Sequence, residues 1–300
     1  MKIYDKHLIA LLSAIIFWGT ALIVVKDALN HMGPMTIAAA RFVIAFLVLL
    51  PFALKRGYTL KKSFEFKYIL LGFIGYAATF IFQNFGLIQC SAATAAIIQA
   101  SLPIVTVIIA YFLISERLNL QKGLGTVLAV FGVILAAGSG LSLDKGTSLL
   151  GIILVFFSMV SWGLYSTLLK RFEIELDVIA ATTAFIGGGL LLLLPLAGIE
   201  IIVGGWPDLN IRSFIALLYL GLLCSLGGIS LWNFALKKVE AGLASIYYNL
   251  VPIVGILAAV LYGERVGSVQ ILGCIITITG VVAATMSKKT PYIKRSTRVR

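Results

Sequence analysis

Polar and aromatic side chains occur within stretches of this sequence that are otherwise apolar. An amide or a phenol that faced lipid would leave its hydrogen-bonding groups unsatisfied, so we expect these side chains to face other helices or an internal cavity. We identify no candidate catalytic residues in the sequence. The candidates for lining a cavity that binds a small molecule are Trp18, Arg41, Tyr76, Gln83, Asn84, Gln99, Trp162, Tyr165, Trp232, Asn233, Tyr247, Tyr248 and Asn249.

Arg41 is the basic residue that lies deepest inside an apolar stretch. A charge at that depth in a membrane costs at least about 2.5 kcal/mol unless it is paired or lines a water-filled space. Arg41 could bind a carboxylate or phosphate, or it could be a structural arginine bonded to backbone carbonyls or extended toward the helix end. Of the two, the structural role is favoured.

Acidic and metal-binding residues are scarce where chemistry would need them. All twelve Asp and Glu residues fall in expected loops or near helix ends, and so do the two histidines, His7 and His31. The three cysteines are far apart, and neither a Gly-x-x-x-x-Gly-Lys-Ser/Thr loop nor a His-Glu-x-x-His motif is present. We therefore expect no enzyme activity, no cofactor and no metal site, and facilitated transport or exchange rather than proton coupling.

The composition indicates an integral membrane protein. Of the 300 residues, 60% are hydrophobic and 12% charged, far from the balance of soluble domains. About 20 apolar residues cross a bilayer as a helix. Ten segments meet this length, near residues 8–29, 35–54, 68–88, 92–114, 121–140, 148–169, 177–197, 212–234, 241–262 and 266–286.

The distribution of basic residues predicts the orientation. With the N-terminus in the cytoplasm, nineteen of the 24 Lys and Arg residues lie on the cytoplasmic side and four on the other, and Arg41 lies within the membrane. Both termini are therefore expected in the cytoplasm. We expect the protein to reside in the plasma membrane. Because the charges cluster in short gaps between apolar stretches, the net charge of +12 does not indicate nucleic-acid binding.

The two halves of the chain repeat each other. Residues 84–105 align without gaps on residues 233–254, and Trp18-Gly19 and Lys26 match Trp162-Gly163 and Lys170 at a constant offset of 144. Since each repeat has five helices, an odd number, equivalent residues lie on opposite sides of the membrane. Inverted repeats of this kind are typical of secondary transporters, in which the halves exchange conformations around a central site.

The repeat pairs several of the candidate residues. Asn84 and Asn233 are equivalent, and either bridge helices or present their amides to a ligand. Gln99 and Tyr248 each precede a proline by four residues, and because a proline frees a backbone carbonyl one turn earlier, Pro103 and Pro252 are candidate hinges. The equivalent residues Trp18 and Trp162 are expected near mid-helix, as a cavity floor, a gate or simple packing.

The order and repetition of short motifs resemble the EamA branch of the drug/metabolite transporter superfamily over essentially the whole chain. These motifs are Trp18-Gly19, Ala40-Arg41-Phe42, Pro103-Ile104, Glu116-Arg117 and Glu264-Arg265. The resemblance implies a carrier, often an exporter of amino acids or other metabolites. It also implies a central cavity between the halves, lined by the third, fourth, eighth and ninth helices and by the first and sixth. One departure is that the second half lacks the Arg41 motif, with Thr183 nearest the matching place.

The expected fold is all-α and integral to the membrane, with ten transmembrane helices in two inverted five-helix repeats. The first repeat covers residues 1–140, the second covers 141–287, and 288–300 form a basic cytoplasmic tail. The expected function is export of small metabolites such as amino acids by alternating access, with lipids and a small-molecule cargo as partners and the oligomeric state left open. The alternatives are a sugar-phosphate or nucleotide-sugar antiporter, which should bring several basic residues into the cavity, and an intramembrane enzyme.

Overall fold

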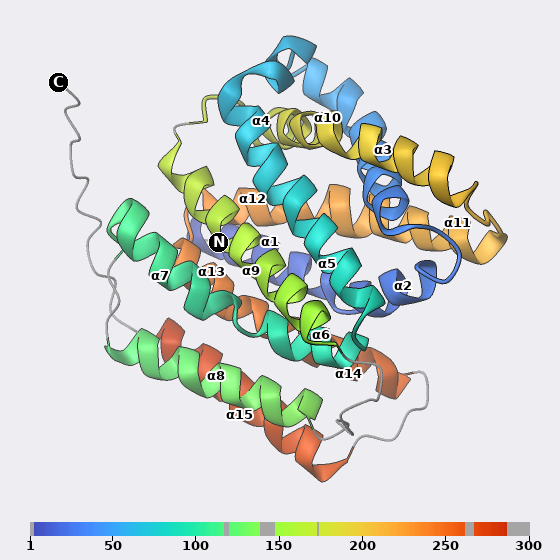
Figure 1. Cartoon of the computed structure of the whole chain (residues 1–300). Coiled ribbons are helices and arrows are strands. Elements are labelled where there is room, and N and C mark those ends of the chain that lie inside the picture. Colours follow the sequence, from blue (N-terminus) through green and yellow to red (C-terminus); the bar gives the residue numbers. More distant parts are fainter. Residues whose placement is uncertain (1–2, 117–119, 139–147, 173, 262–266, 287–300) are drawn as a thin grey trace.

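The computed structural model describes residues 3–116, 120–138, 148–172, 174–261 and 267–286, and every regular element in these ranges is a helix (Figure 1). Arg117, Glu264, Arg265 and the basic tail at 288–300 lie outside the described residues. Apart from one short connecting helix, the described helices group into ten consecutive segments, which we call spans 1 to 10.

The first half contains spans 1 to 5. Span 1 is α1 (Ile3–Trp18) with α2 (Ala21–Ala28); span 2 is α3 (Pro34–Leu54); span 3 is α4 (Phe66–Gly72), the π-helix η2 (Phe73–Ala78) and α5 (Thr79–Ile88); span 4 is α6 (Ala92–Gln99) with α7 (Leu102–Ile114); span 5 is α8 (Leu120–Gly138). A short 3₁₀-helix, η1 (Leu60–Phe64), joins spans 2 and 3.

The second half contains spans 6 to 10. Span 6 is α9 (Leu149–Arg171); span 7 is α10 (Val178–Gly204); span 8 is α11 (Ile211–Leu218), the π-helix η3 (Tyr219–Ile229) and α12 (Ser230–Leu236); span 9 is α13 (Ala241–Tyr248) with α14 (Val251–Leu261); span 10 is α15 (Ser268–Thr285). Among the described residues nine segments are long and apolar enough to cross a membrane, and α8 holds a shorter apolar stretch at Leu120–Ala136. Each of the ten predicted segments coincides with one span.

The spans are irregular at equivalent places in the two halves. Spans 3 and 8 both contain a π-helical stretch, and spans 4 and 9 both break just before a proline. Pro103 and Pro252 are the second residues of α7 and α14, where a missing N–H removes no intrahelical hydrogen bond. Span 1 breaks at Gly19 and Thr20, whereas α9, its counterpart, is continuous.

Close contacts between spans also follow the repeat. A Cβ on Gly19 would lie 2.6 Å from the Val254 Cβ, and a Cβ on Gly163 would lie 2.8 Å from the Thr106 Oγ1, so spans 1 and 6 approach spans 9 and 4 in the same manner. Lys26 donates from Nζ to the carbonyl of Leu87, and its equivalent Lys170 donates to the carbonyl of Leu236 at 2.8 Å. The two halves therefore share a fold as well as a sequence pattern.

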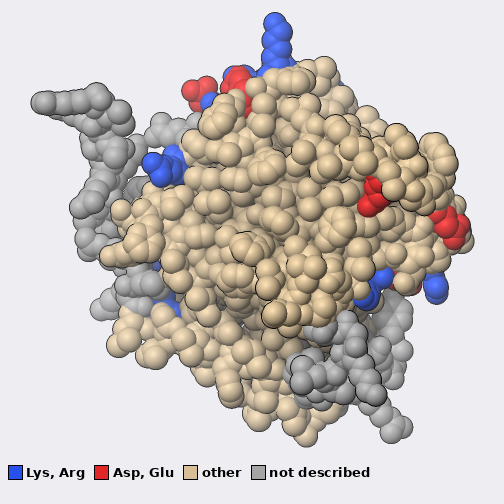
Figure 2. Space-filling model, viewed as in Figure 1, with Lys and Arg blue, Asp and Glu red and all other residues tan. Residues whose placement is uncertain are grey.

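The connections between spans gather at two opposite ends of the bundle. We call face A the end that holds residues 29–33, 89–91 and 205–210, and face B the end that holds residues 55–65, 174–177 and 237–240. Figure 2 shows charged side chains toward opposite edges of the visible surface and uncharged atoms over most of the area between them. This band is the surface that lipid would contact.

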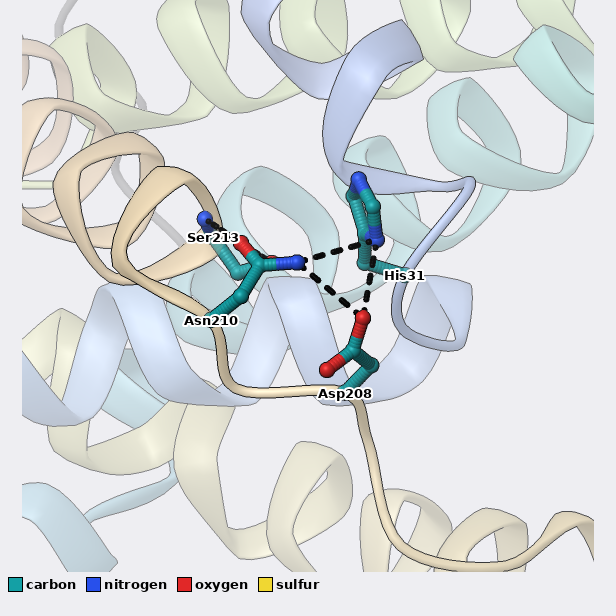
Figure 3. Close-up of polar contacts among 4 residues, drawn as sticks. All are labelled: His31, Asp208, Asn210 and Ser213. Carbon is teal, nitrogen blue, oxygen red and sulfur yellow. Dashed lines mark hydrogen bonds and ion pairs between the residues drawn. The ribbon is translucent and has the colours of Figure 1, made fainter.

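Face A is held together by polar contacts between the two halves. The His31 Nδ1 lies 3.3 Å from the Asp208 Oδ2, and the Asn210 Nδ2 lies 3.0 Å from the same oxygen (Figure 3). Nearby, the Glu200 carboxylate in α10 accepts hydrogen bonds from the backbone N–H groups of Met35 and Thr36 at 3.1 and 2.7 Å. Glu200 thereby caps the N-terminus of α3 with the charge that a helix start favours.

Candidate functional site

A cavity lies between the two halves, toward face A. Its lining comes from spans 1, 2, 3, 4, 6 and 9. The lining residues are Trp18, Ala21, Leu22, Arg41, Thr79, Phe80, Gln83, Gln99, Met159, Trp162 and Tyr248. Six of the predicted residues are therefore brought together here: Trp18, Arg41, Gln83, Gln99, Trp162 and Tyr248.

Aromatic rings form one wall of the cavity. The Trp18 ring meets the Trp162 ring edge to face, with 5.6 Å between centroids, and lies 5.9 Å from the Tyr248 ring. Behind it, the buried Trp232 ring is 5.4 Å from Trp18. The Trp18 Nε1 donates to the Cys224 carbonyl at 3.0 Å, in the π-helical part of span 8. Trp18 is thereby fixed in place, as a rigid apolar wall requires.

The polar part of the cavity is an amide chain across three spans. Gln99 donates from Nε2 to the Gln83 Oε1 at 3.1 Å, and the Tyr248 hydroxyl donates to the Gln99 Oε1 at 3.2 Å. Gln99 and Tyr248 are repeat equivalents, so the chain joins span 4 directly to its counterpart, span 9. Movement of span 4 relative to span 9 would change this contact.

Arg41 enters the cavity from span 2 and is 1% exposed. Its Nε donates to the Ser225 Oγ at 2.8 Å, and its Cζ lies 4.4 Å from the centroid of the Phe80 ring. No backbone carbonyl and no carboxylate among the described residues pairs with the guanidinium. The bonding to backbone carbonyls that a structural arginine would show is therefore not what holds Arg41.

A closed ring of hydrogen bonds lies on the face B side of the cavity. The Tyr165 hydroxyl donates to the Asn233 Oδ1 at 2.7 Å, the Asn233 Nδ2 donates to the Tyr76 hydroxyl at 3.0 Å, and the two hydroxyls are 2.9 Å apart. The second hydrogen of the Asn233 Nδ2 points to the Thr182 Oγ1 at 3.0 Å. Tyr76 and Tyr165 are fully buried, so this ring forms a layer without solvent access between spans 3, 6 and 8.

A second polar layer lies at face B itself. The Glu116 carboxylate accepts from the backbone N–H groups of Ala241 and Gly242, at 3.2 and 3.0 Å, and Lys122 pairs with Glu240. Burial, and then the neighbouring Glu240 carboxylate, raises the pKa of Glu116 above its usual range. These contacts tie the end of span 4 and the start of span 5 to span 9.

The other predicted residues lie outside the cavity lining. Asn84 donates from Nδ2 to the Pro34 carbonyl at 2.9 Å and so bridges spans 3 and 2, which is the helix-bridging role of the two considered. Tyr247 is partly buried against the core. Asn249 is buried at the break in span 9, and neither its Oδ1 nor its Nδ2 has a partner among the described residues. The described part of the chain holds no cluster of three metal-binding side chains.

Two residues were missed by the sequence analysis although the repeat register contains the signal: the partner of Arg41, and the residue that stands in its place in the second half. Ser225 is equivalent to Tyr76, at an offset of 149, and Phe185 lies 144 residues after Arg41. The structure packs Phe185 against Tyr76, with 6.3 Å between ring centroids, as it packs Arg41 against Ser225. Phe185, rather than Thr183, therefore occupies the place of Arg41 in the second half.

Ten spans in two inverted repeats around a cavity between the halves define a secondary transporter fold. Comparison with known families gives the same answer, since the EamA-like transporter family matches twice, over residues 6–138 and 149–286. The chain belongs to this family, within the drug/metabolite transporter superfamily, and is a transporter rather than an enzyme.

Individual relatives cover almost the whole chain. The "Uncharacterized transporter YcxC" of Bacillus subtilis is 32% identical over 91% of this chain and 91% of its own length, and an "Uncharacterized transporter" of Archaeoglobus fulgidus is 28% identical over 92% and 97%. A "Probable amino-acid metabolite efflux pump" of Escherichia coli is 24% identical over 90% and 91%. A solved structure titled "Crystal structure of protein" shares the fold, with a TM-score of 0.77, 20% identity and coverage of 94% of this chain and 98% of the other.

Proposed function

We propose that this protein exports small metabolites, such as amino acids, across the plasma membrane by alternating access. The observation that carries the proposal is the cavity between the halves, which a buried hydrogen-bonded ring separates from face B. A transporter must close one side of its binding site while the other is open, and a layer of this kind is such a barrier.

The direction follows from the proposed orientation. With the termini in the cytoplasm, face B is cytoplasmic and face A external, so the cavity is closed toward the cytoplasm and corresponds to the state that releases cargo outside. In the opposite state the two repeats, residues 1–140 and 141–287, would exchange conformations. The Gln99–Tyr248 contact between spans 4 and 9 would then tighten or break as the face B ring opens.

The lining supports a cargo of low charge over a sugar phosphate or nucleotide sugar. A phosphate cargo calls for several cations around it. Arg41 is the basic residue among the cavity-lining residues of the described structure, while Lys26 and Lys170 are bonded to backbone carbonyls at the ends of spans 3 and 8. The similarity to the efflux pump of E. coli points the same way, toward amino-acid metabolites.

The test compares metabolites inside and outside cells that overproduce the protein, by mass spectrometry. We expect a few compounds to accumulate in the medium with the wild type and to fall back with Trp162→Ala, which removes a cavity wall. Trp206→Ala is the matched control, because Trp206 is 87% exposed on face A and should leave export unchanged. Equal amounts of each variant in the membrane make the comparison valid.

Reconstitution separates a failed assay from a failed proposal. Purified protein in liposomes would be loaded with the same metabolite mixture and the release of each compound followed. If no member of a broad panel crosses the liposome membrane faster than in protein-free liposomes, and no profile changes in cells, the proposal of a metabolite exporter is wrong.

A further inference from the structure

The guanidinium of Arg41 is buried in the cavity with most of its hydrogen-bonding capacity unused. It carries five N–H donors, of which the Nε–H alone bonds a described residue, Ser225. Phe80 covers it from a distance of 4.4 Å, which offsets part of the cost of burying the charge. The terminal nitrogens of the fork are therefore left for a partner that the cavity would hold.

Ser225 and Phe80 also fix the direction of that fork. A guanidinium is planar, so a hydrogen bond at Nε together with an aromatic ring near Cζ restrains both its rotation and its tilt. With Nε occupied, the opposite edge, formed by Nη1 and Nη2, is the one free to make two parallel hydrogen bonds. This geometry suits a planar acceptor with two oxygens.

The rest of the cavity lining offers a further unpaired donor. The Trp162 Nε1 is buried without a partner among the described residues, whereas its repeat counterpart Trp18 bonds the Cys224 carbonyl. The amide oxygens of Gln83 and Gln99 already accept hydrogen bonds. A ligand that supplied acceptors would satisfy the unpaired donors of Arg41 and Trp162.

We infer that the cargo carries a single carboxylate, which docks on the Nη1–Nη2 edge of Arg41 while its apolar remainder lies against Trp18, Trp162 and Met159. One guanidinium neutralises one negative charge, and the apolar lining supplies no second cation among the described residues for a dianion. This inference rests on the proposed function, and it adds the chemical group by which cargo is recognised.

The experiment measures binding, so that it does not depend on finding the transported compound. Detergent-purified protein at pH 7 would be titrated with matched pairs of small acids and their amides: acetate and acetamide, hexanoate and hexanamide, phenylacetate and phenylacetamide. Binding is followed by the rise in thermal unfolding temperature and by quenching of tryptophan fluorescence. At least one carboxylate of the panel should bind, and its neutral amide at least about tenfold more weakly, because the amide loses the charge-assisted pair.

Substitutions at Arg41 connect the preference to this residue. Arg41→Gln should abolish the difference between acid and amide, and Arg41→Lys should retain part of it, because lysine keeps the charge but not the fork. The control is Arg56→Gln, which removes an arginine that is exposed on face B and paired with Asp177. It should bind the same carboxylate as the wild type does.

The outcomes distinguish this inference from the proposed function. If no carboxylate binds better than its amide in the wild type, or if Arg41→Gln keeps the preference, the inference is wrong, whether or not metabolites are exported. The wild-type comparison alone decides this if a variant does not fold. A transporter that moves metabolites in liposomes without any preference for carboxylates would overturn the docking role of Arg41 and leave the exporter standing.

Discussion

The polar residues of the face B ring satisfy one another almost completely. The Tyr165 hydroxyl donates its hydrogen to Asn233, and the Asn233 amide donates to the Tyr76 oxygen. The hydrogen of the Tyr76 hydroxyl is therefore the one that lies between the two tyrosines, and it is donated to the Tyr165 oxygen. Each hydroxyl then donates once and accepts once. A buried network that is fully paired is stable, and the loss of one member leaves the others unpaired at a cost.

This accounting predicts that Tyr165→Phe destabilises the protein. Removing the hydroxyl leaves the Asn233 Oδ1 without a donor and Tyr76 without an acceptor, which should cost about 1–3 kcal/mol. The matched control is Tyr68→Phe, because the Tyr68 hydroxyl is equally buried and has no partner among the described residues. Thermal unfolding in detergent should show a lower melting temperature for Tyr165→Phe and an unchanged or higher one for Tyr68→Phe. Equal losses in the two variants would contradict the ring.

The raised pKa of Glu116 predicts that the stability of the protein depends on pH. Burial and then Glu240 raise its pKa above the ordinary value of 4.5. An acid whose pKa is raised by folding holds its proton more tightly when folded, so it adds stability below the unfolded pKa, and this is lost as the pH rises through the folded pKa. Glu116→Gln stays neutral at every pH and should lack that loss.

The measurement for Glu116 is the melting temperature of wild type and variant from pH 4 to pH 9. The wild type should lose stability relative to Glu116→Gln as the pH rises from about 4.5. The facing groups Glu240, Lys122 and Lys170 are common to both proteins, so the difference isolates Glu116. Glu65→Gln, which changes a partly exposed carboxylate paired with Lys62, is the control. A constant difference between wild type and Glu116→Gln would refute the raised pKa.

The sequence could predict that Arg41 is buried but not what it bonds. Charge and depth follow from the position of Arg41 within an apolar segment, and the structure confirms its burial. Its partners, Ser225 and Phe80, come from spans 8 and 3, and nothing in the local sequence marks a serine or a phenylalanine among so many apolar neighbours. Contacts between distant spans depend on packing, which periodicity does not encode.

At the scale of elements, α8 and α15 form a close antiparallel pair along the edge of the bundle (Figure 1). A Cβ on Gly132 would lie 2.4 Å from the backbone nitrogen of Thr277, and one on Gly125 would lie 2.7 Å from the Gly280 carbonyl oxygen. The two helices are spans 5 and 10, the equivalent last helices of the two repeats, and the inverted repeat predicted that equivalent helices run in opposite directions. Small residues allow helix backbones in a membrane to approach each other closely.

This contact predicts opposite effects of two substitutions in the same helix. Gly132→Ala should lower stability by about 1–3 kcal/mol, because the added methyl group meets backbone and cannot be relieved by a side-chain rotation. Gly123→Ala adds the same methyl where no atom of another described segment lies within 4 Å, and alanine favours the helix, so stability should be unchanged or higher. Melting temperatures of the two purified variants decide the matter, and a neutral Gly132→Ala would show that α8 and α15 are not in such close contact.

The helices were predictable and their irregularities only in part. Apolar length sets each span, so all ten predicted segments coincide with spans of the structure. Proline marked the places where spans 4 and 9 break, since the helices end at Gln99 and Tyr248 and restart at Leu102 and Val251. The π-helical stretches η2 and η3 contain no proline, so proline does not mark them in the sequence; neighbouring spans approach closely just before η2, at Gly72, and within η3, at Gly221.

At the scale of the whole molecule, the two repeats are structurally equivalent but chemically different. Lys26 and Lys170 bond backbone carbonyls at equivalent places near opposite faces, and Gly19 and Gly163, within spans 1 and 6, make similar close contacts. Arg41, by contrast, has Phe185 as its counterpart, and the cavity therefore holds one guanidinium on one side only. A shared fold would allow the halves to exchange conformations, and under the proposed docking on Arg41 the chemical difference between the halves would orient the cargo.

The orientation of the bundle can be tested with single cysteines on the two faces. Leu209→Cys on face A should react with a membrane-impermeant maleimide in intact cells, because Leu209 is exposed and face A is expected outside the cell. Lys61→Cys on face B is also exposed and should react only after the cells are permeabilised, because the excess of basic residues predicts that face B is cytoplasmic. The wild type gives the background, since Cys90 and Cys224 are buried and Cys274 is partly buried within α15. Labelling of Lys61→Cys alone in intact cells would show that face B is external and the proposed orientation is reversed. The cavity, which lies toward face A, would then be on the cytoplasmic side, and the structure would represent the state that loads cargo rather than the state that releases it.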